Sequence, residues 1–404
     1  MIIQMRILFL SRWFPYPPNN GSKLRIYNLL RGLSREHDVT LISFTSKSPS
    51  GNDQPVTERV LAELKGLCTD VQVVPYQPYN PTSTRALLGF VSPTPRSVID
   101  TYVPQMESTI RRELDSGQYD LVIASERDTA DYWPAFRNMP AIFEDIELGI
   151  FEARKAQART LLHRLRHELT GLKLKFYLRR LLPHFGATTV VSNVEANLLR
   201  GMVPGYQSIE VIPNGVNLNE YADICPVVQP NTLIFTGSFS FSPNYEAMVW
   251  FLREVFPRVQ AKVPSVRLTI TGDHANRPLP PADQVTLTGF VDDVRPFIAN
   301  SYISLAPIRF GGGTRLKILE AMALRTPVVA TSKGAEGLDV QHNEHLLIAD
   351  TPEAHAEAIL RLLQEPGLRQ RLADKAYQLV RQKYDWSVVT PRLLDLVERV
   401  GGAS

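Results

Sequence analysis

Short apolar runs alternate with helix-forming segments along most of the chain, and this alternation restricts the folds that are open to it. The chain begins with the apolar run MRILFL, followed by a loop rich in Pro, Asn and Gly, the helical pattern KLRIYNLLRGL and a second apolar run, DVTLISF. Apolar runs of about six residues that alternate with helical periodicity are typical of a parallel sheet covered by helices on both faces. The sequence therefore predicts an α/β fold.

The alternation occurs in two series, which predicts two domains. The first series ends near Pro213-Asn214-Gly215, and the second starts after the connector Cys225–Asn231. Strands are expected at 5–10, 71–74, 119–124, 141–143, 187–191, 232–236, 266–271, 285–287, 302–306 and 327–330. Helices are expected at 245–260, from 314 onward, and at 353–363, 368–382 and 387–400.

The length agrees with two domains, since 404 residues exceed the usual domain size of about 150. We expect two Rossmann-like parallel-sheet domains that face a central cleft. The first domain comprises residues 1–216 and is joined by the C-terminal helix 385–404, and the second comprises 217–384. Open sheets of this kind bind ligands at the carboxyl ends of their strands.

Composition excludes several classes of protein. No apolar run approaches the roughly 18 residues of a membrane-spanning helix, and the net charge of +3 gives no overall case for nucleic-acid binding. The two cysteines, Cys68 and Cys225, have neither disulfide-framework nor zinc-ligand spacing, and the chain has no Asp-x-Asp. We therefore predict a cytoplasmic protein without a metal site.

The most informative stretch is 306–331, APIRFGGGTRLKILEAMALRTPVVAT. Gly311, Gly312 and Gly313 follow a strand and precede a helix expected from Thr314. Glycines let backbone amides approach a ligand closely, and a helix N-terminus offers unpaired N–H groups and a partial positive charge. This pattern predicts a binding site for a diphosphate, although a plain glycine-rich turn is the alternative.

Three charged residues in the expected helix support the diphosphate site. Arg315 and Lys317 fall in its first turn, where cations oppose the helix dipole unless an anion is bound. Glu320 lies further along, roughly 9 Å from the start at 1.5 Å per residue, where a carboxylate reaches a ribose hydroxyl pair. The alternative interpretation is a solvated basic first turn.

An acidic cluster follows the strand at 141–143. Glu144, Asp145 and Glu147 together are costly to desolvate, so at least one should have a raised pKa or a polar partner. Recognition of an acceptor hydroxyl or acceptance of its proton fits this chemistry. Capping of a helix that starts near Ile150 explains the acids equally well.

Basic residues concentrate between Phe151 and His184, where Leu, Phe and Tyr are interleaved with them. They are Arg154, Lys155, Arg159, Arg164, Arg166, Lys173, Lys175, Arg179 and Arg180. A basic helix with an apolar stripe can lie on an anionic membrane. Alternatively, it is a solvated helix whose leucines pack inward.

Several motifs resemble those of retaining glycosyltransferases with the GT-B fold, of the family 4 type found in exopolysaccharide clusters. They are the N-terminal segment from MRILFLSRWFPYPPNNGSK, ATTVVSNVEANLL with VIPNGVN, TGSFSFSPNYEAMVWFL, and LTGFVDDVRPFIANSYISLAPIRFGGGTRLKILEAMALRTPVVATSKGAEGL. The resemblance implies that the last segment binds a nucleotide-sugar donor, with Glu320 at the ribose and Thr314 and Arg315 at the phosphates and sugar. It also implies a backbone approach point at Gly21, where a plain turn is the alternative, whereas Ser192 is interpreted as a helix N-cap.

The chain departs from the family pattern in three places. Gly312 occupies the position eight residues before Glu320, where the family has a glutamate that binds the donor sugar. The loop Gly237–Phe241 lacks the family's Arg and Lys, so that Arg315 and Lys317 would supply the charge for the phosphates. Ile146 lies nearest the position of the family's histidine, within the acidic cluster.

The resemblance implies an enzyme that transfers a sugar, with retention, from a nucleoside-diphosphate sugar to a saccharide or lipid-linked acceptor. We assign catalytic roles to Arg315, Lys317, Glu144 and Glu147, and an acceptor role to Asp145. No cofactor besides the donor substrate is expected. The alternatives are a nucleotide-sugar epimerase or hydrolase and a non-catalytic carbohydrate-binding relative, whereas a dehydrogenase is disfavoured because the first loop lacks GxGxxG.

Overall fold

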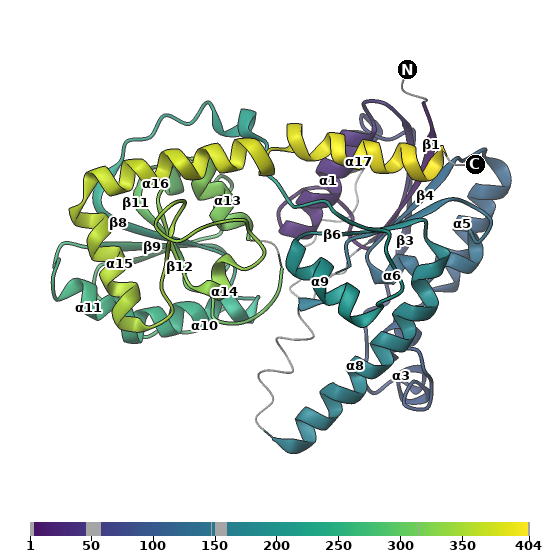
Figure 1. Ribbon diagram of the computed structural model, residues 1–404, viewed down its shortest axis with the longest axis horizontal. Helices are drawn as coiled ribbons and strands as arrows, with labels where there is room; N and C mark the ends of the chain where they lie inside the picture. Colours follow the sequence, from purple (N-terminus) through teal and green to yellow (C-terminus); the bar gives the residue numbers. More distant parts are fainter. Residues whose placement is uncertain (1–3, 46–57, 147, 150–159, 314, 403–404) are drawn as a thin grey trace. The chain divides into compact units, whose positions relative to one another are not determined.

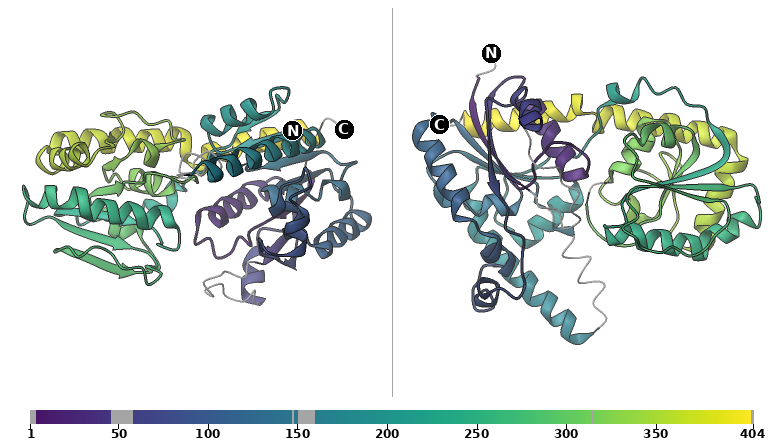
Figure 2. Two further views of the ribbon diagram at one scale, coloured as in Figure 1. Left: turned by 90° about the horizontal axis from the view of Figure 1, so that it is seen from below. Right: turned by 180° about the vertical axis from the view of Figure 1, so that it is seen from behind.

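The computed structural model describes residues 4–45, 58–146, 148–149, 160–313 and 315–402. The chain divides into two compact units: unit 1 contains Met1–Pro213 and Thr390–Ser404, and unit 2 contains Asn214–Val389. Each unit has one sheet with helices on both sides (Figures 1 and 2). The acceptor and donor roles expected for the two domains stay predictions.

Unit 1 is built on a seven-stranded parallel sheet with the order β3-β2-β1-β4-β5-β6-β7. Its elements are β1 (Arg6–Ser11), α1 (Gly21–Leu33), β2 (Asp38–Thr45), α2 (Glu58–Lys65), β3 (Asp70–Pro75), α3 (Thr84–Leu88), α4 (Arg96–Thr101), α5 (Pro104–Ser116), β4 (Leu121–Ser125), α6 (Arg127–Ala130), η1 (Trp133–Ala135), β5 (Ala141–Glu144), α8 (Leu161–Leu181), η2 (Leu182–His184), β6 (Ala187–Val190), α9 (Asn193–Met202) and β7 (Ile209–Val211). All strand pairs are parallel.

Unit 2 is built on a six-stranded parallel sheet with the order β10-β9-β8-β11-β12-β13. Its elements are η3 (Leu218–Tyr221), β8 (Gln229–Thr236), α10 (Ser242–Trp250), η4 (Phe251–Val255), α11 (Phe256–Gln260), β9 (Arg267–Thr271), β10 (Val285–Gly289), α12 (Arg295–Ala299), β11 (Ser301–Ala306), α13 (Leu316–Ala323), β12 (Val328–Ala330), α14 (Ser332–Ala335), β13 (Leu347–Ile348), α15 (Pro352–Gln364), α16 (Pro366–Leu379) and η5 (Val380–Tyr384). The predicted α/β fold with two parallel sheets is confirmed.

Both faces of the unit 2 sheet are buried, which explains why its strands have continuous apolar runs. In β8, Leu233 and Phe235 belong to one hydrophobic cluster, with residues of α10 and α15, whereas Ile234 belongs to another, with residues of α13 and α16. Successive side chains of a strand point to opposite faces. A helix layer therefore covers each face of the sheet.

The last helix, α17 (Trp386–Gly401), contributes most of its length to unit 1. Its Thr390 lies so close to Gly32 of α1 that a Cβ on Gly32 would be 2.7 Å from the Thr390 Cγ2 atom, and Gly401 lies against Met5. These contacts attach the C-terminal helix to the first sheet.

Three details of the structure were not predicted from the sequence. The expected helix 245–260 contains a π-helical segment, η4, which immediately precedes α11 with its Pro257, a residue that lacks the amide needed to continue a regular helix. The expected connector Cys225–Asn231 overlaps β8, which starts at Gln229. The short strand β13 was not predicted, because two residues carry no periodicity.

His355 gives unit 2 a pH-dependent contribution to stability. This side chain of α15 is completely buried, and its Nδ1 atom lies 3.0 Å from the carbonyl oxygen of Ala349. Burial lowers the pKa of His355 to about 4. The folded chain therefore keeps the imidazole neutral at pH values at which the unfolded chain binds a proton.

We expect the free energy of unfolding to fall between pH 6.5 and pH 4 by about 3 kcal/mol because of His355 alone. Urea titrations at several pH values would measure this loss, which His355→Gln should remove from the pH dependence. His163→Gln, a change at an exposed histidine of α8, is the control and should keep the wild-type slope. An equal slope in His355→Gln and wild type would contradict the prediction.

Candidate functional site

The candidate donor site lies at the switch point of the unit 2 sheet. The chain runs from β8 to β9 and β10 on one side, and continues with β11, β12 and β13 on the other side of β8. The loops after the neighbouring strands β8 and β11 therefore leave the sheet in opposite directions. Open α/β sheets bind ligands at such points, outside the carboxyl ends of the strands.

The loop after β11 adopts a conformation that requires glycine. Gly311 and Gly313 have φ angles of 96° and 94°, in the region that other residues rarely adopt. A Cβ on Gly311 would also lie 2.8 Å from the Cγ atom of Pro243. The predicted glycine loop is therefore present, but α13 begins at Leu316, and Thr314 lies outside the described residues.

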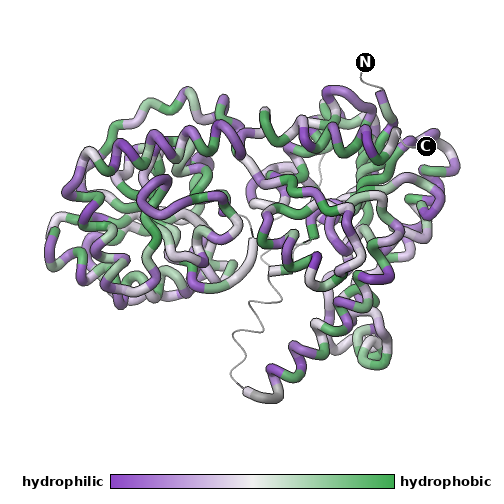
Figure 3. The backbone as a smooth tube through the Cα atoms, viewed as in Figure 1, coloured by the Kyte–Doolittle hydropathy of each residue, from purple (hydrophilic) through white to green (hydrophobic). Residues whose placement is uncertain are grey.

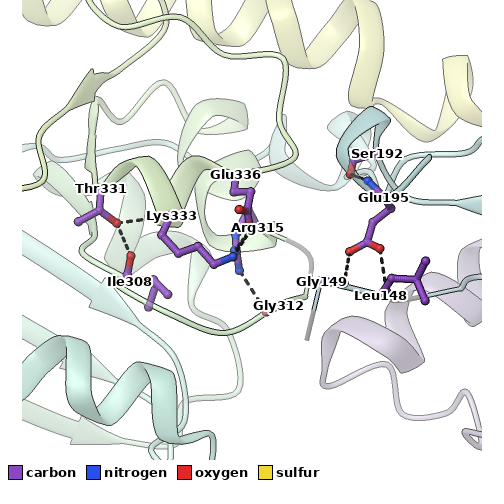
Figure 4. A network of polar contacts seen from close by, with 11 residues as sticks. Leu148, Gly149, Ser192, Glu195, Ile308, Gly312, Arg315, Thr331, Lys333 and Glu336 are labelled. Carbon is purple, nitrogen blue, oxygen red and sulfur yellow. Dashed lines mark hydrogen bonds and ion pairs between the residues drawn. The ribbon is translucent and has the colours of Figure 1, made fainter. Parts of the chain in front are cut away.

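Arg315 is the N-cap residue of α13, and its side chain is buried. Its Nη1 atom donates a hydrogen bond of 3.1 Å to the Gly312 carbonyl oxygen, and its Nη2 atom lies 3.6 Å from the Glu336 Oε2 atom (Figure 4). Lys333 forms an ion pair with the same Glu336 carboxylate. Arg315 thus links the glycine loop to α14.

Lys317, in the first turn of α13, lies next to the loop that follows β8. Its Nζ atom donates a hydrogen bond of 2.9 Å to Asn244 Oδ1, and Asn244 Nδ2 donates one of 2.9 Å to the Ser238 carbonyl oxygen. The ammonium group also lies 4.0 Å from the centre of the Phe235 ring. Burial, together with the positive charge of Arg315, lowers the pKa of Lys317 to about 7. A bound anion would favour the charged form.

Glu320 lies on the second turn of α13, as predicted. Burial raises its pKa to about 7, although Lys317 and a hydrogen bond from Tyr221 oppose the shift. Arg295 is ion-paired with Asp293 at 2.8 Å and lies 5.9 Å from the centre of the Tyr221 ring. The Glu320 carboxyl group is therefore poised between its two protonation states near neutral pH.

In unit 1, Glu144 forms a buried ion pair with Arg25 of α1. The Arg25 Nε atom donates to Glu144 Oε1 at 2.7 Å, and Ser125 Oγ donates to Oε2 at 2.5 Å. Arg25 also donates a hydrogen bond of 3.0 Å to the Ile212 carbonyl oxygen. Both side chains are almost completely buried. This geometry gives Glu144 a structural role, and its catalytic role stays a prediction.

The other members of the acidic cluster are arranged differently. Asp145 has a φ of 61°, its amide donates to Thr189 Oγ1 at 3.0 Å, and its carboxylate lies 3.6 Å from Arg25 Nε. Burial raises its pKa to about 6, with Arg25 opposing the shift. The sequence predicted that at least one acid of the cluster has a polar partner or a raised pKa, and Glu144 and Asp145 confirm this prediction. Glu147 and the helix expected from Ile150 lie outside the described residues.

Two further predicted positions are helix starts. Gly21 is the first residue of α1, whose N-cap is Asn20. Ser192 is the N-cap of α9, as predicted, and accepts a hydrogen bond of 3.2 Å from the Glu195 amide. The Glu195 carboxylate in turn accepts hydrogen bonds from the amides of Leu148 and Gly149 at 2.7 and 2.9 Å (Figure 4). The approach of Gly21 to a ligand stays a prediction.

The described part of the predicted basic segment is mainly the helix α8, along which hydrophilic and hydrophobic stretches alternate (Figure 3). Leu174 and Leu178 are buried, but other apolar residues of α8 are exposed and lie on one face of the helix. Apolar residues of the neighbouring α3 segment are exposed too. These residues form what we call the α3–α8 surface: Leu87, Leu88, Phe90, Val91, Leu165, Leu169, Leu172 and Phe176. The alternative of a helix whose leucines pack inward therefore holds for Leu174 and Leu178 but not for Leu165, Leu169 and Leu172.

Lys173 connects the two parts of the α3–α8 surface. Its Nζ atom donates hydrogen bonds to the Gly89 and Phe90 carbonyl oxygens at 3.0 and 2.7 Å. The Arg96 guanidinium group stacks on the Phe90 ring at 3.8 Å. In the part of the chain that the structure describes, no helix has both the length and the apolar character needed to span a membrane.

Within the described ranges, no three His, Cys, Asp or Glu side chains are grouped as ligands of a metal ion. The expectation of a metal-independent site stays a prediction.

Two family models define the class of protein to which the chain belongs. Residues 19–220 match the family model described as Glycosyltransferase Family 4, and residues 230–365 match the one described as glycosyl transferases group 1. The chain belongs to Glycosyltransferase Family 4. The sequence-based identification of this family is thereby confirmed.

The curated relatives match over part of their length. A phosphatidyl-myo-inositol mannosyltransferase of Mycobacterium tuberculosis is 29% identical over 222 residues, which cover 49% of this chain and 56% of the relative. An uncharacterized 44.6 kDa protein in the cps region of Klebsiella pneumoniae is 27% identical over 164 residues, or 38% of this chain and 42% of the relative. The chain thus spans about half the length of these relatives.

Solved structures match the fold over nearly the whole chain. Sucrose-phosphate synthase from Thermosynechococcus elongatus has a TM-score of 0.71 at 18% identity, covering 99% of this chain and 100% of that one. The Anabaena protein HepE, solved in complex with UDP-glucose, has a TM-score of 0.63 at 16% identity, covering 98% and 100%. The two-sheet architecture is therefore that of GT-B glycosyltransferases.

If the Arg25–Glu144 pair is structural, Glu144→Gln should lower the free energy of unfolding by about 3 kcal/mol, because it removes the closer of the two counter-charges of a buried guanidinium group. The double variant with Arg25→Met and Glu144→Leu should lose much less. Urea unfolding followed by circular dichroism would measure both effects. Glu353→Gln, which breaks an exposed ion pair with Arg258, is the control and should leave the unfolding midpoint nearly unchanged. A Glu144→Gln variant with wild-type stability would contradict the structural role.

Proposed function

We propose that this protein transfers a sugar from a nucleoside-diphosphate sugar to an acceptor hydroxyl group, with retention at the anomeric carbon. Membership of Glycosyltransferase Family 4 supports the reaction class. The observation that carries the donor assignment is Lys317, a partly buried lysine whose pKa is lowered to about 7 beside a glycine loop and a helix N-terminus. A diphosphate supplies the negative charge that this environment lacks.

The donor would bind along α13. In this proposal the diphosphate lies at the loop containing Gly311, Gly312 and Gly313, where it accepts hydrogen bonds from backbone amides and from Lys317. Glu320, whose carboxyl group lies one turn further along, would bind the ribose hydroxyl groups. Arg315 is paired with Glu336 and holds the Gly312 carbonyl, so that its contribution is to fix the loop and to add positive charge nearby.

The chemical step needs a group that stabilises the leaving diphosphate. As the glycosidic bond breaks, negative charge accumulates on the phosphate oxygens, and interactions stronger with this dianion than with the intact donor accelerate the reaction. Lys317 and the α13 amides have this property. The leaving phosphate can accept the proton of the acceptor hydroxyl on the same face, so the proposal requires no protein nucleophile.

Solved structures and relatives support both substrate classes. HepE was solved with UDP-glucose, and a Staphylococcus aureus TarM variant with UDP and saccharide ligands. Several relatives are named phosphatidyl-myo-inositol mannosyltransferase. By analogy, we propose a nucleotide-sugar donor and a saccharide or lipid-linked acceptor.

Binding of a nucleoside diphosphate should be accompanied by proton uptake at pH 8, because the anion raises the lowered pKa of Lys317. Calorimetry with UDP and with GDP, in two buffers of different ionisation enthalpy, measures the number of protons. We expect uptake approaching about one proton in the wild type, little in Lys317→Met, and weaker affinity in Glu320→Gln.

Lys375→Met removes an exposed lysine of α16 and should behave as wild type. If neither nucleotide binds, the donor assignment is wrong. If Lys317→Met binds with the same proton uptake as wild type, Lys317 is not the phosphate ligand.

We further propose that the α3–α8 surface binds an anionic lipid bilayer, which would present a lipid-linked acceptor. Exposed apolar residues such as Phe90 and Val91 are suited to the acyl boundary, and the cations of α8 to anionic headgroups. Each cation near such a surface contributes about 1 kcal/mol. Arg154, Lys155 and Arg159 of the predicted basic segment lie outside the described residues.

Replacing Arg164, Arg166, Lys173 and Lys175 by Gln should abolish co-sedimentation with vesicles of phosphatidylcholine and phosphatidylglycerol, because four positive charges are lost. A control with Gln at Arg371, Lys375, Arg381 and Lys383 loses the same charge from exposed positions of α16 and η5 and should remain bound. Unchanged sedimentation of the first variant, or a wild type that dimerises through this surface without binding vesicles, would contradict the membrane proposal.

A further inference from the structure

The segment 237–244, which follows β8 and begins α10, lies at the candidate donor site but carries no cation. Its sequence, GSFSFSPN, contains neither Arg nor Lys. The ammonium group of Lys317 reaches this segment from α13, and the side chain that receives it is Asn244. Asn244 therefore joins an uncharged segment to a charge from another helix.

The side-chain amide of Asn244 is held in one orientation. It is 9% exposed. Its Nδ2 atom donates a hydrogen bond of 2.9 Å to the Ser238 carbonyl oxygen, and its Oδ1 atom accepts one of 2.9 Å from Lys317 Nζ. Because a carbonyl group only accepts and an ammonium group only donates, the two ends of the amide cannot be exchanged.

The backbone beneath Asn244 is fixed to the neighbouring strand. The Gly237 amide donates a hydrogen bond of 3.0 Å to the Thr271 carbonyl oxygen. A Cβ on Gly237 would lie 2.6 Å from Asn244 Nδ2, and one on Gly272 would lie 2.7 Å from the Gly237 carbonyl carbon. The sheet therefore determines where Asn244 Oδ1 lies, and with it the position of the Lys317 ammonium group.

Two contacts hold Lys317 Nζ and leave its other donors available. The centre of the completely buried Phe235 ring lies 4.0 Å from it. Within the residues that the structure describes, Asn244 is its one hydrogen-bond acceptor. An ammonium group has three N–H donors, so two remain for the oxygens of a phosphate group.

An uncharged partner suits a lysine that binds an anion. A carboxylate in place of the Asn244 amide could accept the same hydrogen bond, but its negative charge would compensate that of the ammonium group. The amide oxygen accepts the bond and leaves the positive charge in place. Stabilisation of a leaving diphosphate depends on that charge.

We propose that Asn244 is a positioning residue of the donor site, which orients Lys317 toward the diphosphate and leaves its positive charge uncompensated. The inference rests on the proposed function and adds a residue that acts through Lys317. It also explains how a segment without cations takes part in binding a diphosphate.

Other ionisable groups act on Lys317 as well. Burial has the largest effect on its pKa and lowers it, Arg315 lowers it further, and Glu320 raises it. Glu246 of α10 and Asp273 after β9 accept hydrogen bonds within their own segments. A carboxylate at position 244 would add a negative charge at hydrogen-bonding distance, which should raise the pKa of Lys317 by about 2.

The first test measures the charge of Lys317 in the full chain without nucleotide. Acetic anhydride at pH 8 modifies neutral amines, and mass spectrometry gives the rate at Lys317 relative to the exposed Lys375. In Asn244→Asp, Lys317 should react about tenfold more slowly than in the wild type, because the added carboxylate keeps it protonated. Asn244→Ala adds no charge and should leave the rate close to that of the wild type.

The second test measures nucleotide binding by calorimetry with UDP and GDP at pH 8, in two buffers of different ionisation enthalpy. Asn244→Ala should bind about tenfold more weakly but keep the proton uptake, because Lys317 is neutral before binding and no longer held in place. Asn244→Asp should bind more weakly and take up few protons, because Lys317 is already charged. If Asn244 only supported the fold, both variants would take up protons as the wild type does.

Asn343→Asp makes the same chemical change at an exposed position and should match the wild type in both tests. Circular dichroism shows whether each variant is folded. The proposal is overturned if Lys317 reacts equally fast in Asn244→Asp and wild type, or if Asn244→Ala binds nucleotide as tightly as the wild type. A wild type that binds neither nucleotide contradicts the donor assignment, whereas the labelling rates still show whether Asn244 controls the charge of Lys317.

Discussion

The carboxyl ends of all strands in a parallel sheet lie along one edge, and the candidate donor site depends on this constraint. In unit 2, the elements after β8 and β11 bring Asn244 and Lys317 within hydrogen-bonding distance, although they are 73 residues apart in the chain. The hydrogen bonds between the strand backbones determine where each loop begins. The side chains at this edge can therefore differ from one protein to another without altering the sheet.

The structure contains two kinds of buried charged groups. The difference between them indicates which groups stabilise the fold and which are suited to binding a ligand. The Arg25–Glu144 pair is almost fully buried, and both carboxylate oxygens of Glu144 accept hydrogen bonds, so the two charges neutralise each other away from solvent. Lys317 and Glu320 are less completely neutralised, and burial brings the pKa of each to about 7. Groups whose protonation changes near neutral pH respond to a charged ligand. The second pair therefore suits a site that receives and releases a diphosphate.

Sequence reasoning located most strands, because a strand buried on both faces is a continuous apolar run. It also located the glycine loop and Glu320, since three consecutive glycines before a helix are a local pattern. It did not predict Asn244 or Tyr221 at the candidate donor site, or Arg25 at Glu144, because these contacts join distant segments. The structure also places the start of α13 later than the predicted Thr314. Arg315 is the N-cap residue, and its side chain donates a hydrogen bond to the Gly312 carbonyl oxygen, which helix propensity does not reveal.

By itself, the sequence determined the fold class, the family and the glycine loop at the carboxyl edge of the second sheet. Apolar periodicity and consecutive glycines are local patterns that can be recognised within a few residues. Only the tertiary structure decided which charged groups are paired and with what. Glu144 meets Arg25 across 119 residues of chain, whereas Lys317 meets the neutral amide of Asn244. The physical reason is that desolvation and charge pairing depend on distances between elements, which strand order determines and local sequence does not.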